Sequence, residues 1–532
     1  MASLIIDKKS SGEYLRIVEG YRDDQGRKRM RTLFNLGRVD SYTPEALRRI
    51  GERLYQLGGG DLKDLVGEHA TEEGRFNYGF ATICRKLLEY YSLDLVLKRI
   101  TKKKKLSYDL VEVVLFLLVE RLHDPCSKLA SYRHQQDYFE LPPVSLQHLY
   151  RCLDYLADHS KLIQQTIFNT GRDLFNRKLD VVFYDVTTFY FDSDKQVPDT
   201  LRQKGFSKDG KMGKTQVVFG MLIDQYKQPV GYQLYQGNQY EGHTYLDMVA
   251  RLKQQYQIDR IILVADRGML SSENLSKTEQ EGYEFIVGER LRTLPQAQQD
   301  ELLNPENYQL EWTTPGSDEQ NPHVVKYTSI HYEGRQIIGT YSAKRAKKDR
   351  MEREKRLEKA EQLLKNPSGL KKKAAHYFLK STKKDQYELD QEKINNSQRY
   401  DGYLAIAYQA KGITALQALE QYHQLYQIEH SFRTFKSYLE TRPMFHWNDK
   451  RIQGHICLCY MAYGMLNQLQ LRLSKQGTPM SENQIRETLD KMQVSLIRQG
   501  DNQFYMRSKL SESARQMLQV VGEKPLADLF AK

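Results

Sequence analysis

The stretch Asp180-Val-Val-Phe-Tyr-Asp185-Val-Thr-Thr188 marks the change from helical to strand-like sequence in this chain of 532 residues. It is apolar and rich in β-branched residues, which is typical of a buried strand. Two more strand-like runs follow at residues 215–224 and 229–235, with the turn-like residues 225–228 between them. We expect these three consecutive strands to form an antiparallel meander.

Helices alternate with strands after the meander. A helical stretch over residues 244–255 leads into Arg260-Ile-Ile-Leu-Val-Ala-Asp266, a continuous apolar run that fits a strand covered on both faces. We expect this strand to lie parallel to the first. A helix over residues 271–281 and a short strand over residues 283–287 complete a β-β-β-α-β-α-β order. The sequence therefore predicts an α/β fold built on a mixed sheet.

Other regions of different character flank this core. Residues 1–42 alternate apolar and polar around Asp23-Asp-Gln-Gly26, which predicts a hairpin, and helical periodicity follows to about residue 178. Strand-like pieces and a basic helical segment interrupt the core after residue 288. The expected organisation is a small β element (1–42), a mainly helical DNA-binding region (43–178), the first part of the core (179–288), an insertion domain (289–410), the second part of the core (411–475) and a C-terminal helical region (476–532).

The composition favours a polyanionic partner. The chain has 80 Lys and Arg against 68 Asp and Glu, a net charge of +12, so nucleic acid is the natural candidate. The five cysteines lack the paired spacing of a zinc site and are expected to be reduced, mostly buried thiols. No apolar run approaches the roughly 20 residues that span a bilayer. We expect a cytoplasmic protein without membrane association.

Positive charge is concentrated in two segments. Residues 98–105 contain six cations in eight residues, including Lys102, Lys103, Lys104 and Lys105. This run is expected to contact phosphates or, equally compatible with the sequence, to form a solvated loop. Residues 344–384 contain 16 Lys and Arg against 5 Asp and Glu, a net charge of +11. We expect this part of the insertion to be the main electrostatic contact surface, although a solvated, charge-paired helix is the alternative.

The second informative stretch is Tyr422-His-Gln-Leu-Tyr-Gln-Ile-Glu429-His-Ser-Phe-Arg433-Thr-Phe-Lys436. An α-helix turns about 100° per residue, so Tyr422, Glu429 and Lys436 would fall within about 40° of one another on one face. A carboxylate flanked by cations suits a metal held against a phosphate, because Lys436 and Arg433 can balance the charge of the phosphate. An ordinary amphipathic helix facing solvent is the alternative interpretation.

Two further carboxylates are expected near Glu429. Asp185 ends the first strand and Asp266 ends the fourth, so both should emerge at one edge of the sheet if the two strands are neighbours. Three clustered carboxylates repel one another, and two Mg²⁺ or Mn²⁺ ions would relieve this repulsion and favour phosphodiester cleavage. Taken singly, each Asp has an ordinary alternative role as a cap of the following turn or helix.

Three segments resemble the DDE-type bacterial insertion-sequence transposases that carry a Tyr-Arg-Glu-Lys signature. They are Phe183-Tyr-Asp185-Val-Thr-Thr, Val264-Ala-Asp266-Arg-Gly-Met, and residues 422–436 continuing to Leu439-Glu-Thr-Arg442-Pro443. Tyr422, Glu429 and Lys436 match the signature at its spacing, whereas Leu425 stands at the Arg position. Arg433, one turn after Glu429, is the proposed substitute. The resemblance covers approximately residues 175–475.

This resemblance implies a ribonuclease-H-like catalytic core with a β-rich insertion and a cut-and-paste reaction. Asp185, Asp266 and Glu429 would bind the metal ions, while Tyr422 and Lys436 would hold the phosphate at the transposon end. It also implies binding to terminal inverted repeats and target DNA, and a bacterial, nucleoid-associated protein. Because two ends are joined together, we expect a homodimer in the synaptic complex. Some relatives capture a flipped base on an aromatic side chain, and Trp312 is the candidate here, although a lone Trp is more often a core residue.

Two other functions remain open from the sequence. The first is a non-catalytic DNA-binding protein derived from a transposase, which acts by occupying its site. The second is a metal-dependent, structure-specific nuclease that does not join strands. An intact acidic triad argues against the first, because binding to a polyanion does not require three clustered carboxylates.

Overall fold

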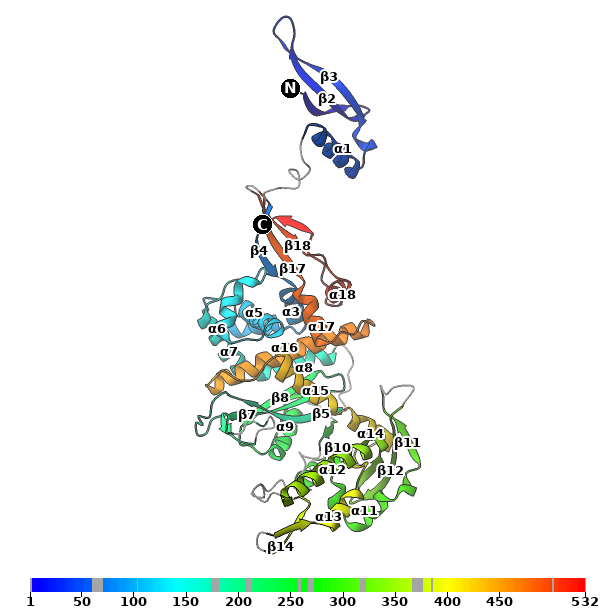
Figure 1. The fold of residues 1–532 in the computed structure, drawn as a ribbon. Coiled ribbons are helices and arrows are strands. Elements are labelled where there is room, and N and C mark those ends of the chain that lie inside the picture. Colours follow the sequence, from blue (N-terminus) through cyan, green and yellow to red (C-terminus); the bar gives the residue numbers. More distant parts are fainter. Residues whose placement is uncertain are drawn as a thin grey trace. The chain divides into compact units, whose positions relative to one another are not determined.

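The computed structural model describes residues 2–59, 70–102, 104–173, 181–206, 210, 213–256, 260–266, 272–280, 282–315, 322–365, 377–383, 386–499 and 502–531. The chain divides into two compact units, and the smaller one contains segments from both ends of the sequence (Figure 1). The smaller comprises Met1–Arg75, Ser495–Met506 and Ala527–Lys532, and the larger comprises Phe76–Val494 and Arg507–Leu526.

The chain begins with a three-stranded antiparallel sheet of β1 (Ala2–Lys9), β2 (Gly12–Arg22) and β3 (Lys28–Arg38), in that order. The turn between β2 and β3 is closed by Asp23, whose carboxylate accepts hydrogen bonds from the backbone N–H groups of Gln25 and Arg27. Gly26 has φ +76°, a conformation that glycine adopts at little cost. This finding confirms the predicted hairpin. Helix α1 (Pro44–Leu57) follows.

The C-terminal region is not purely helical, so that prediction was wrong. Besides α17 (Glu482–Asp490) and α18 (Glu512–Val520), it contains β17 (Gln493–Gln499), β18 (Asn502–Arg507) and β19 (Leu529–Ala531). They form a four-stranded sheet in the order β19-β18-β17-β4, and β4 (Ala70–Asn77) comes from the region predicted to be helical. The pattern that indicates β17 is the alternation of buried Val494 and Leu496 with partly exposed residues.

The predicted β-β-β-α-β-α-β order is confirmed in the larger unit. The elements are β5 (Val181–Tyr190), β7 (Thr215–Asp224), β8 (Pro229–Gln236), α9 (Glu241–Tyr256), β9 (Ile262–Ala265), α10 (Ser272–Gln280) and β10 (Glu284–Glu289), with the two-residue β6 (Gln203–Lys204) before β7. The pairs β5–β7 and β7–β8 are antiparallel, whereas β5–β9 and β9–β10 are parallel. The sheet is therefore mixed, as expected.

The insertion extends this sheet at its β10 edge. Strand β16 (Tyr403–Gln409) pairs antiparallel with β10, and β13 (Arg335–Tyr341), β12 (Val324–Tyr332) and β11 (Leu310–Thr313) continue beyond it. The resulting ten-stranded sheet buries strand edges that would otherwise be open. The insertion also contains α11 (Gln296–Leu303), the basic helix α12 (Ala343–Lys365), α13 (Gln391–Gln398) and the hairpin of β14 (Leu379–Lys383) and β15 (Gln386–Leu389).

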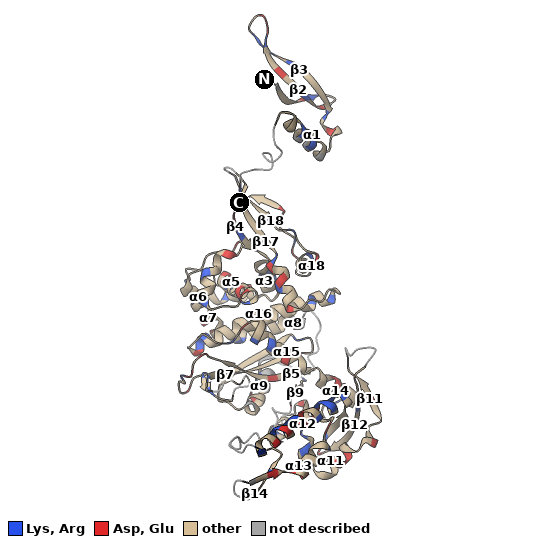
Figure 2. Ribbon diagram, in the orientation of Figure 1, with Lys and Arg blue, Asp and Glu red and all other residues tan. Residues whose placement is uncertain are grey.

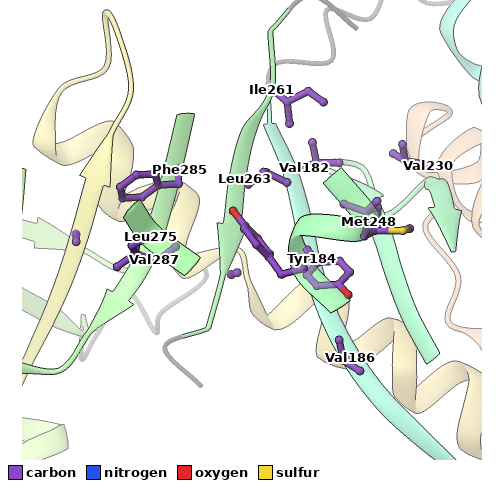
Figure 3. Close-up of a cluster of buried hydrophobic side chains, with 14 of the residues drawn as sticks. Val182, Tyr184, Val186, Val230, Met248, Ile261, Leu263, Leu275, Phe285 and Val287 are labelled. Atoms are coloured by element: carbon purple, nitrogen blue, oxygen red, sulfur yellow. The ribbon is translucent and has the colours of Figure 1, made fainter. Parts of the chain in front are cut away.

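The core of the sheet is apolar. Val182 and Tyr184 of β5, Leu263 of β9, Phe285 of β10 and Met248 of α9 belong to one cluster of buried apolar side chains (Figure 3). Burying one such side chain contributes about 1.5–3 kcal/mol, so this cluster is a main source of the stability of the unit. It also fixes β5, which contains Asp185, and β9, which Asp266 follows directly.

The helical part of the larger unit comprises α3 (Gly79–Tyr90), α4 (Leu93–Thr101), α5 (Leu110–His123), α6 (Lys128–His134), α7 (Leu146–Asp158) and α8 (Ser160–Asp173). The long helix α16 (Asp449–Lys475) packs against α5, α7, α8 and β8. Most of its residues between Ile452 and Leu469 are buried, which is the expected state of a helix that is apolar on all sides. Helix α16 thus connects the helical region with the sheet.

Gly454 allows α16 to lie close to α7. A Cβ atom at this position would lie 2.0 Å from the carbonyl oxygen of Leu153, so the backbone would have to move. We expect Gly454→Val to destabilise the protein by about 3 kcal/mol, the upper part of the usual range for overpacking. Gly464→Ala on the same helix is the control, because its nearest contact is the Pro229 side chain at 3.3 Å. Thermal unfolding measures both; equal midpoints would contradict the prediction.

All five cysteines are free, and four of them, Cys84, Cys152, Cys457 and Cys459, are buried, as predicted. Within the residues that the structure describes, no helix combines the length and the hydropathy that crossing a membrane requires.

Candidate active site

The stretch from Tyr422 to Lys436 is not one regular helix, so that expectation was wrong. Tyr422 lies on α14 (Ala415–His423), Glu429 lies on α15 (Tyr426–Arg433) and Lys436 lies in a π-helical turn, Thr434–Tyr438. Between the two α-helices, the Leu425 N–H bonds to the Tyr422 carbonyl three residues back, at 3.1 Å. A tighter turn followed by a wider one changes the angular spacing of the side chains, and π-helical turns are frequent at functional sites.

Aromatic packing fixes α15 and the π-helical turn on the sheet. Phe435 lies 5.2 Å from Phe219 of β7 and 6.4 Å from Phe189 of β5, measured between ring centroids. Phe432 approaches the same Phe219 ring edge-on. Glu429 is exposed on a different face of this helix. The apolar face of the helix therefore determines where the carboxylate lies.

The parallel pairing of β5 and β9 brings two predicted acids side by side, but the expectation that Asp185 ends its strand was wrong, because β5 continues along β7 as far as Tyr190. The register pairs Val182 with Leu263 and Phe183 with Val264. Continued by two residues, the same register sets Asp185 beside Asp266. Neighbouring strands lie about 4.8 Å apart, so the two carboxylates start from adjacent positions. The Asp185 carboxylate accepts a hydrogen bond of 2.7 Å from the Val186 N–H, and Asp266 is exposed directly after β9.

Asp266 and Glu429 line one cavity of about 760 Å³. Tyr422 and Leu425 are also part of its wall, and α12 contributes three cations, Lys344, Arg345 and Lys348. The sequence indicated α12 as a contact surface but gave no reason to connect it with the acids, because Lys348 and Glu429 are 81 positions apart. Figure 2 marks Lys and Arg positions along α12, with Asp and Glu positions among them. A carboxylate pair with cations beside it can accommodate a metal-bound phosphate group.

Other predicted residues lie elsewhere. Among the described residues, Asp185, Arg433 and Lys436 are not part of the wall of this cavity; Arg433 is exposed and Lys436 is half-buried. The ligand atoms of the three acids do not all lie within 4.8 Å of one another. In the described part of the chain, the group of three that does is Glu120, Cys126 and His134 in the helical region, which the sequence analysis did not single out.

Trp312 lies on the cavity wall and is only 8% exposed. Its ring contacts His423 edge-on at 5.1 Å, and burial, followed by the charge of His323, lowers the pKa of His423. Trp312 is therefore both a packed side chain and a neighbour of Asp266 and Glu429. Trp447, the second Trp, is 61% exposed and has the Arg202 guanidinium 4.4 Å above its ring.

The predicted basic run of the helical region is exposed at Lys102, Lys104 and Lys105, and Lys103 lies outside the described residues. The Lys104 ammonium lies 4.3 Å from the ring centroid of Tyr155. This cation–π contact holds the end of one lysine against α7, so the run is partly packed rather than fully solvated.

Comparison with known proteins gives two family matches. The family described as "Transposase DDE domain" matches residues 176–465, and the family described as "IS1634 family transposase, N-terminal domain" matches residues 5–62. No curated protein matches the sequence.

Several solved structures are similar to parts of the chain. The piggyBac transposase synaptic complex with hairpin DNA is 9% identical, with 78% of each chain covered and a TM-score of 0.36. The Mos1 transposase paired-end complex with left transposon end is 14% identical, with 36% of this chain and 57% of that chain covered and a TM-score of 0.15. The Mos1 mariner paired end complex with Mn is 15% identical, with coverage of 40% and 62% and a TM-score of 0.14.

Proposed function

This chain belongs to the insertion-sequence transposases with a DDE domain, and on that premise we propose that it moves an insertion sequence by cut-and-paste transposition. It binds the terminal inverted repeats, hydrolyses phosphodiester bonds at the ends of the element and joins those ends to target DNA. The observation that carries the proposal is the parallel register that brings Asp185 beside Asp266, together with the cavity that Asp266 shares with Glu429.

The strand arrangement supports a ribonuclease-H-like catalytic core. Its central strands run in the order β8-β7-β5-β9-β10, with β5, β9 and β10 mutually parallel and the first two pairs antiparallel. In this proposal α14, α15 and the π-helical turn complete the core, and β11 to β13 belong to the insertion. Asp266 then directly follows β9, Asp185 lies beside it within β5, and Glu429 comes from α15.

The donor set fits a pair of Mg²⁺ or Mn²⁺ ions. Asp185, Asp266 and Glu429 offer only carboxylate oxygens, which these ions prefer to the sulfur and nitrogen ligands of zinc sites. When bound, the ions would make water, and then a 3′-hydroxyl, more acidic and balance charge on the phosphate. The three carboxylates would hold the ions, while the apolar packing of Phe432 and Phe435 keeps the Glu429 helix in place.

Phosphate binding in this proposal uses residues from three elements. The Tyr422 hydroxyl can donate a hydrogen bond to a phosphate oxygen. Lys436, in the π-helical turn after α15, supplies an ammonium group. Leu425 stands at the Arg position of the signature and lines the cavity. Arg345 of α12 lines the same cavity, and its guanidinium can make the phosphate contact of the missing Arg. We therefore assign the missing cation to Arg345 rather than to Arg433, which is not part of the wall formed by described residues.

The remaining assignments concern DNA and assembly. Lys102, Lys104 and Lys105, with Lys103 between them, contact phosphates of the end DNA. Trp312 stacks on an extruded base if the reaction passes through a hairpin, which requires the ring to become more exposed than its present 8%. Two chains assemble as a homodimer on two ends, because both ends must be joined to one target. The protein acts on the DNA of a bacterial nucleoid.

One assay distinguishes the proposal from its two alternatives. Full-length protein is incubated with Mg²⁺, a linear DNA carrying the terminal inverted repeat, and a plasmid target. Transposition predicts cleavage at the end followed by covalent joining to the plasmid. Cleavage without joining would instead assign a structure-specific nuclease. Sequence-specific binding with no cleavage in Mg²⁺ or Mn²⁺ would assign a protein that acts by occupancy.

The two exposed lysines of the cavity give a separate test of the DNA path. We expect Lys344→Met combined with Lys348→Met to weaken end binding and to reduce the slope of log K against log salt by about 1.8, because each phosphate contact contributes about 0.9. Lys359→Met is the control, since it lies about 16 Å beyond Lys348 along α12. Fluorescence anisotropy at several salt concentrations measures the slopes. Equal slopes for the double variant and the wild type would exclude these contacts.

A further inference from the structure

A second, smaller cavity lies in the helical region of the larger unit. Its volume is about 140 Å³, and α5, α6, α7, α16 and the loop after Leu439 contribute to its wall. Its polar wall includes Arg121, Lys128, Arg442, His446 and His455. None of these side chains has a role in the proposed cleavage reaction. The cavity is therefore independent of the acidic site.

The cations of this cavity are buried. Arg121 is 4% exposed and Lys128 is 3% exposed, and neither forms an ion pair within the described residues. One Arg121 nitrogen donates a hydrogen bond of 3.0 Å to the Leu439 carbonyl, whereas its Nε atom is buried without a partner. The Nδ1 atom of buried His455 forms no hydrogen bond of good geometry, although the Thr441 backbone lies close to this ring. Buried, uncompensated donors of this kind are costly, so each indicates a group that completes the site.

The nearby acids do not neutralise the cavity. Glu120 is buried beside Arg121 in the chain, but its carboxylate accepts hydrogen bonds from the Tyr138 hydroxyl at 2.6 Å and the Cys126 thiol at 3.3 Å, and it is not part of the wall. Glu440 is part of the wall but is exposed to solvent. The inside of the cavity is therefore positive.

The pKa values agree with this electrostatic picture. Burial, and then the charge of Arg121, lowers the pKa of Lys128 to about 8. Burial, followed by the charges of Lys128 and Arg121, lowers the pKa of His446 to about 3. The groups therefore disfavour one another's charged forms, and an anion bound among them would reverse that effect. A metal cation would add to the repulsion.

We propose that this cavity binds a tetrahedral oxyanion of the phosphate type, held by Arg121, Lys128 and His455, with Arg442 at its exposed side. The volume suits such a ligand, because a water-sized group occupies about 30 Å³ of liquid volume and phosphate has four oxygens. Arginine and lysine are the usual partners of phosphate oxygens. The oxyanion is either a backbone phosphate of bound DNA or free inorganic phosphate.

The site is connected to the strand that bears Asp185. Arg121 holds the Leu439 carbonyl, and the Met444 N–H bonds to the Tyr190 carbonyl at the end of β5, at 3.0 Å. The loop between these two anchors carries Arg442 and precedes His446. An oxyanion in the cavity would therefore brace this loop between the helical region and the sheet.

The first arm of the test uses inorganic phosphate. Isothermal titration calorimetry of the full-length protein at constant ionic strength is expected to show one phosphate per chain, with chloride as the reference anion. Lys128→Met is expected to weaken this binding at least tenfold, and Lys491→Met, an exposed lysine of the same unit, is expected to leave it unchanged. Arg442→Gln provides a second variant if the buried substitution prevents folding, since Arg442 is only half-buried.

The second arm uses double-stranded DNA carrying the terminal repeat. If DNA supplies the phosphate, Lys128→Met reduces the slope of log K against log salt by about 0.9. A changed slope assigns the site to the DNA backbone, whereas saturable binding of free phosphate with an unchanged slope assigns it to the free ion. The absence of both effects would overturn the proposal. The phosphate arm does not depend on transposition, so its failure and the failure of the cleavage assay are distinguishable.

Discussion

Glu429→Gln is expected to reduce cleavage of the transposon end by about a thousandfold or more while end binding remains within about twofold of the wild type. The substitution keeps the size and the hydrogen-bonding capacity of the side chain but removes a charged metal ligand. Metal ions contribute several kcal/mol to the stabilisation of a phosphoryl transition state, and about 4 kcal/mol corresponds to a thousandfold change in rate. Single-turnover cleavage of a labelled end, with binding measured separately, gives both quantities.

Glu487→Gln is the matched control for this experiment. Glu487 is an exposed glutamate on α17 and is not part of either cavity wall, so its substitution is expected to leave cleavage unchanged. A comparable loss in both variants would indicate a general effect of lost negative charge. Unchanged turnover in Glu429→Gln alone would falsify the assignment of this carboxylate to the active site.

The sheet could be predicted from the sequence because local sequence patterns indicate its strands. The apolar runs before Asp185 and Asp266 indicate buried strands, and a mixed sheet is the simple way to accommodate a meander followed by β-α-β units. The place of the insertion in the sheet was harder to predict. Its strands β11 to β13 were recognisable as β-like, but nothing local indicates that they join the β10 edge through β16, since this depends on pairing between residues more than 60 positions apart.

Helical periodicity alone did not predict the backbone of the segment from Tyr422 to Lys436. Ideal geometry predicts one helix from Tyr422 to Lys436, and the apolar residues Ile428, Phe432 and Phe435 agree with it. The structure has a tight turn at Leu425 and a π-helical turn after Arg433. In the π-helical turn, Phe435 packs against Phe189 and Phe219, which lie more than 200 residues earlier. Tertiary packing of this kind leaves no signal in a local sequence window.

The position of the cavity cations was also not predictable from the local sequence. Composition identified residues 344–384 as basic, but Lys344, Arg345 and Lys348 reach the wall that contains Asp266 and Glu429 only through the connection from β13 to α12. In contrast, the expectation from the sequence that β5 and β9 are parallel neighbours was right and brought Asp185 and Asp266 together, although Asp185 lies within β5 and not at its end. Residues whose position depends on sheet order were predictable, whereas those that depend on the insertion were not.

Removal of divalent cations is expected to stop cleavage completely, and addition of Mg²⁺ or Mn²⁺ is expected to restore it. The reason is the register of β5 and β9. It places the backbones of Asp185 and Asp266 side by side, and neighbouring strands lie about 4.8 Å apart. Two ionised carboxylates at this separation repel each other, and a bound cation turns the repulsion into attraction. Cleavage in EDTA followed by titration with each metal measures the dependence.

A binding experiment separates the metal site from the reaction itself. Asp266→Asn is expected to weaken Mn²⁺ binding at least tenfold, measured by the free-ion signal in electron paramagnetic resonance, because the amide retains one oxygen but loses the charge that holds a hard cation. Glu487→Gln again serves as the control and is expected to bind Mn²⁺ as the wild type does. Asn at position 266 keeps the size of the side chain, so a loss of Mn²⁺ binding with unchanged thermal unfolding would locate the ion at the end of β9, beside Asp185 of β5. Wild-type Mn²⁺ affinity in Asp266→Asn, or cleavage that persists in EDTA, would exclude a metal site formed by this pair of strands.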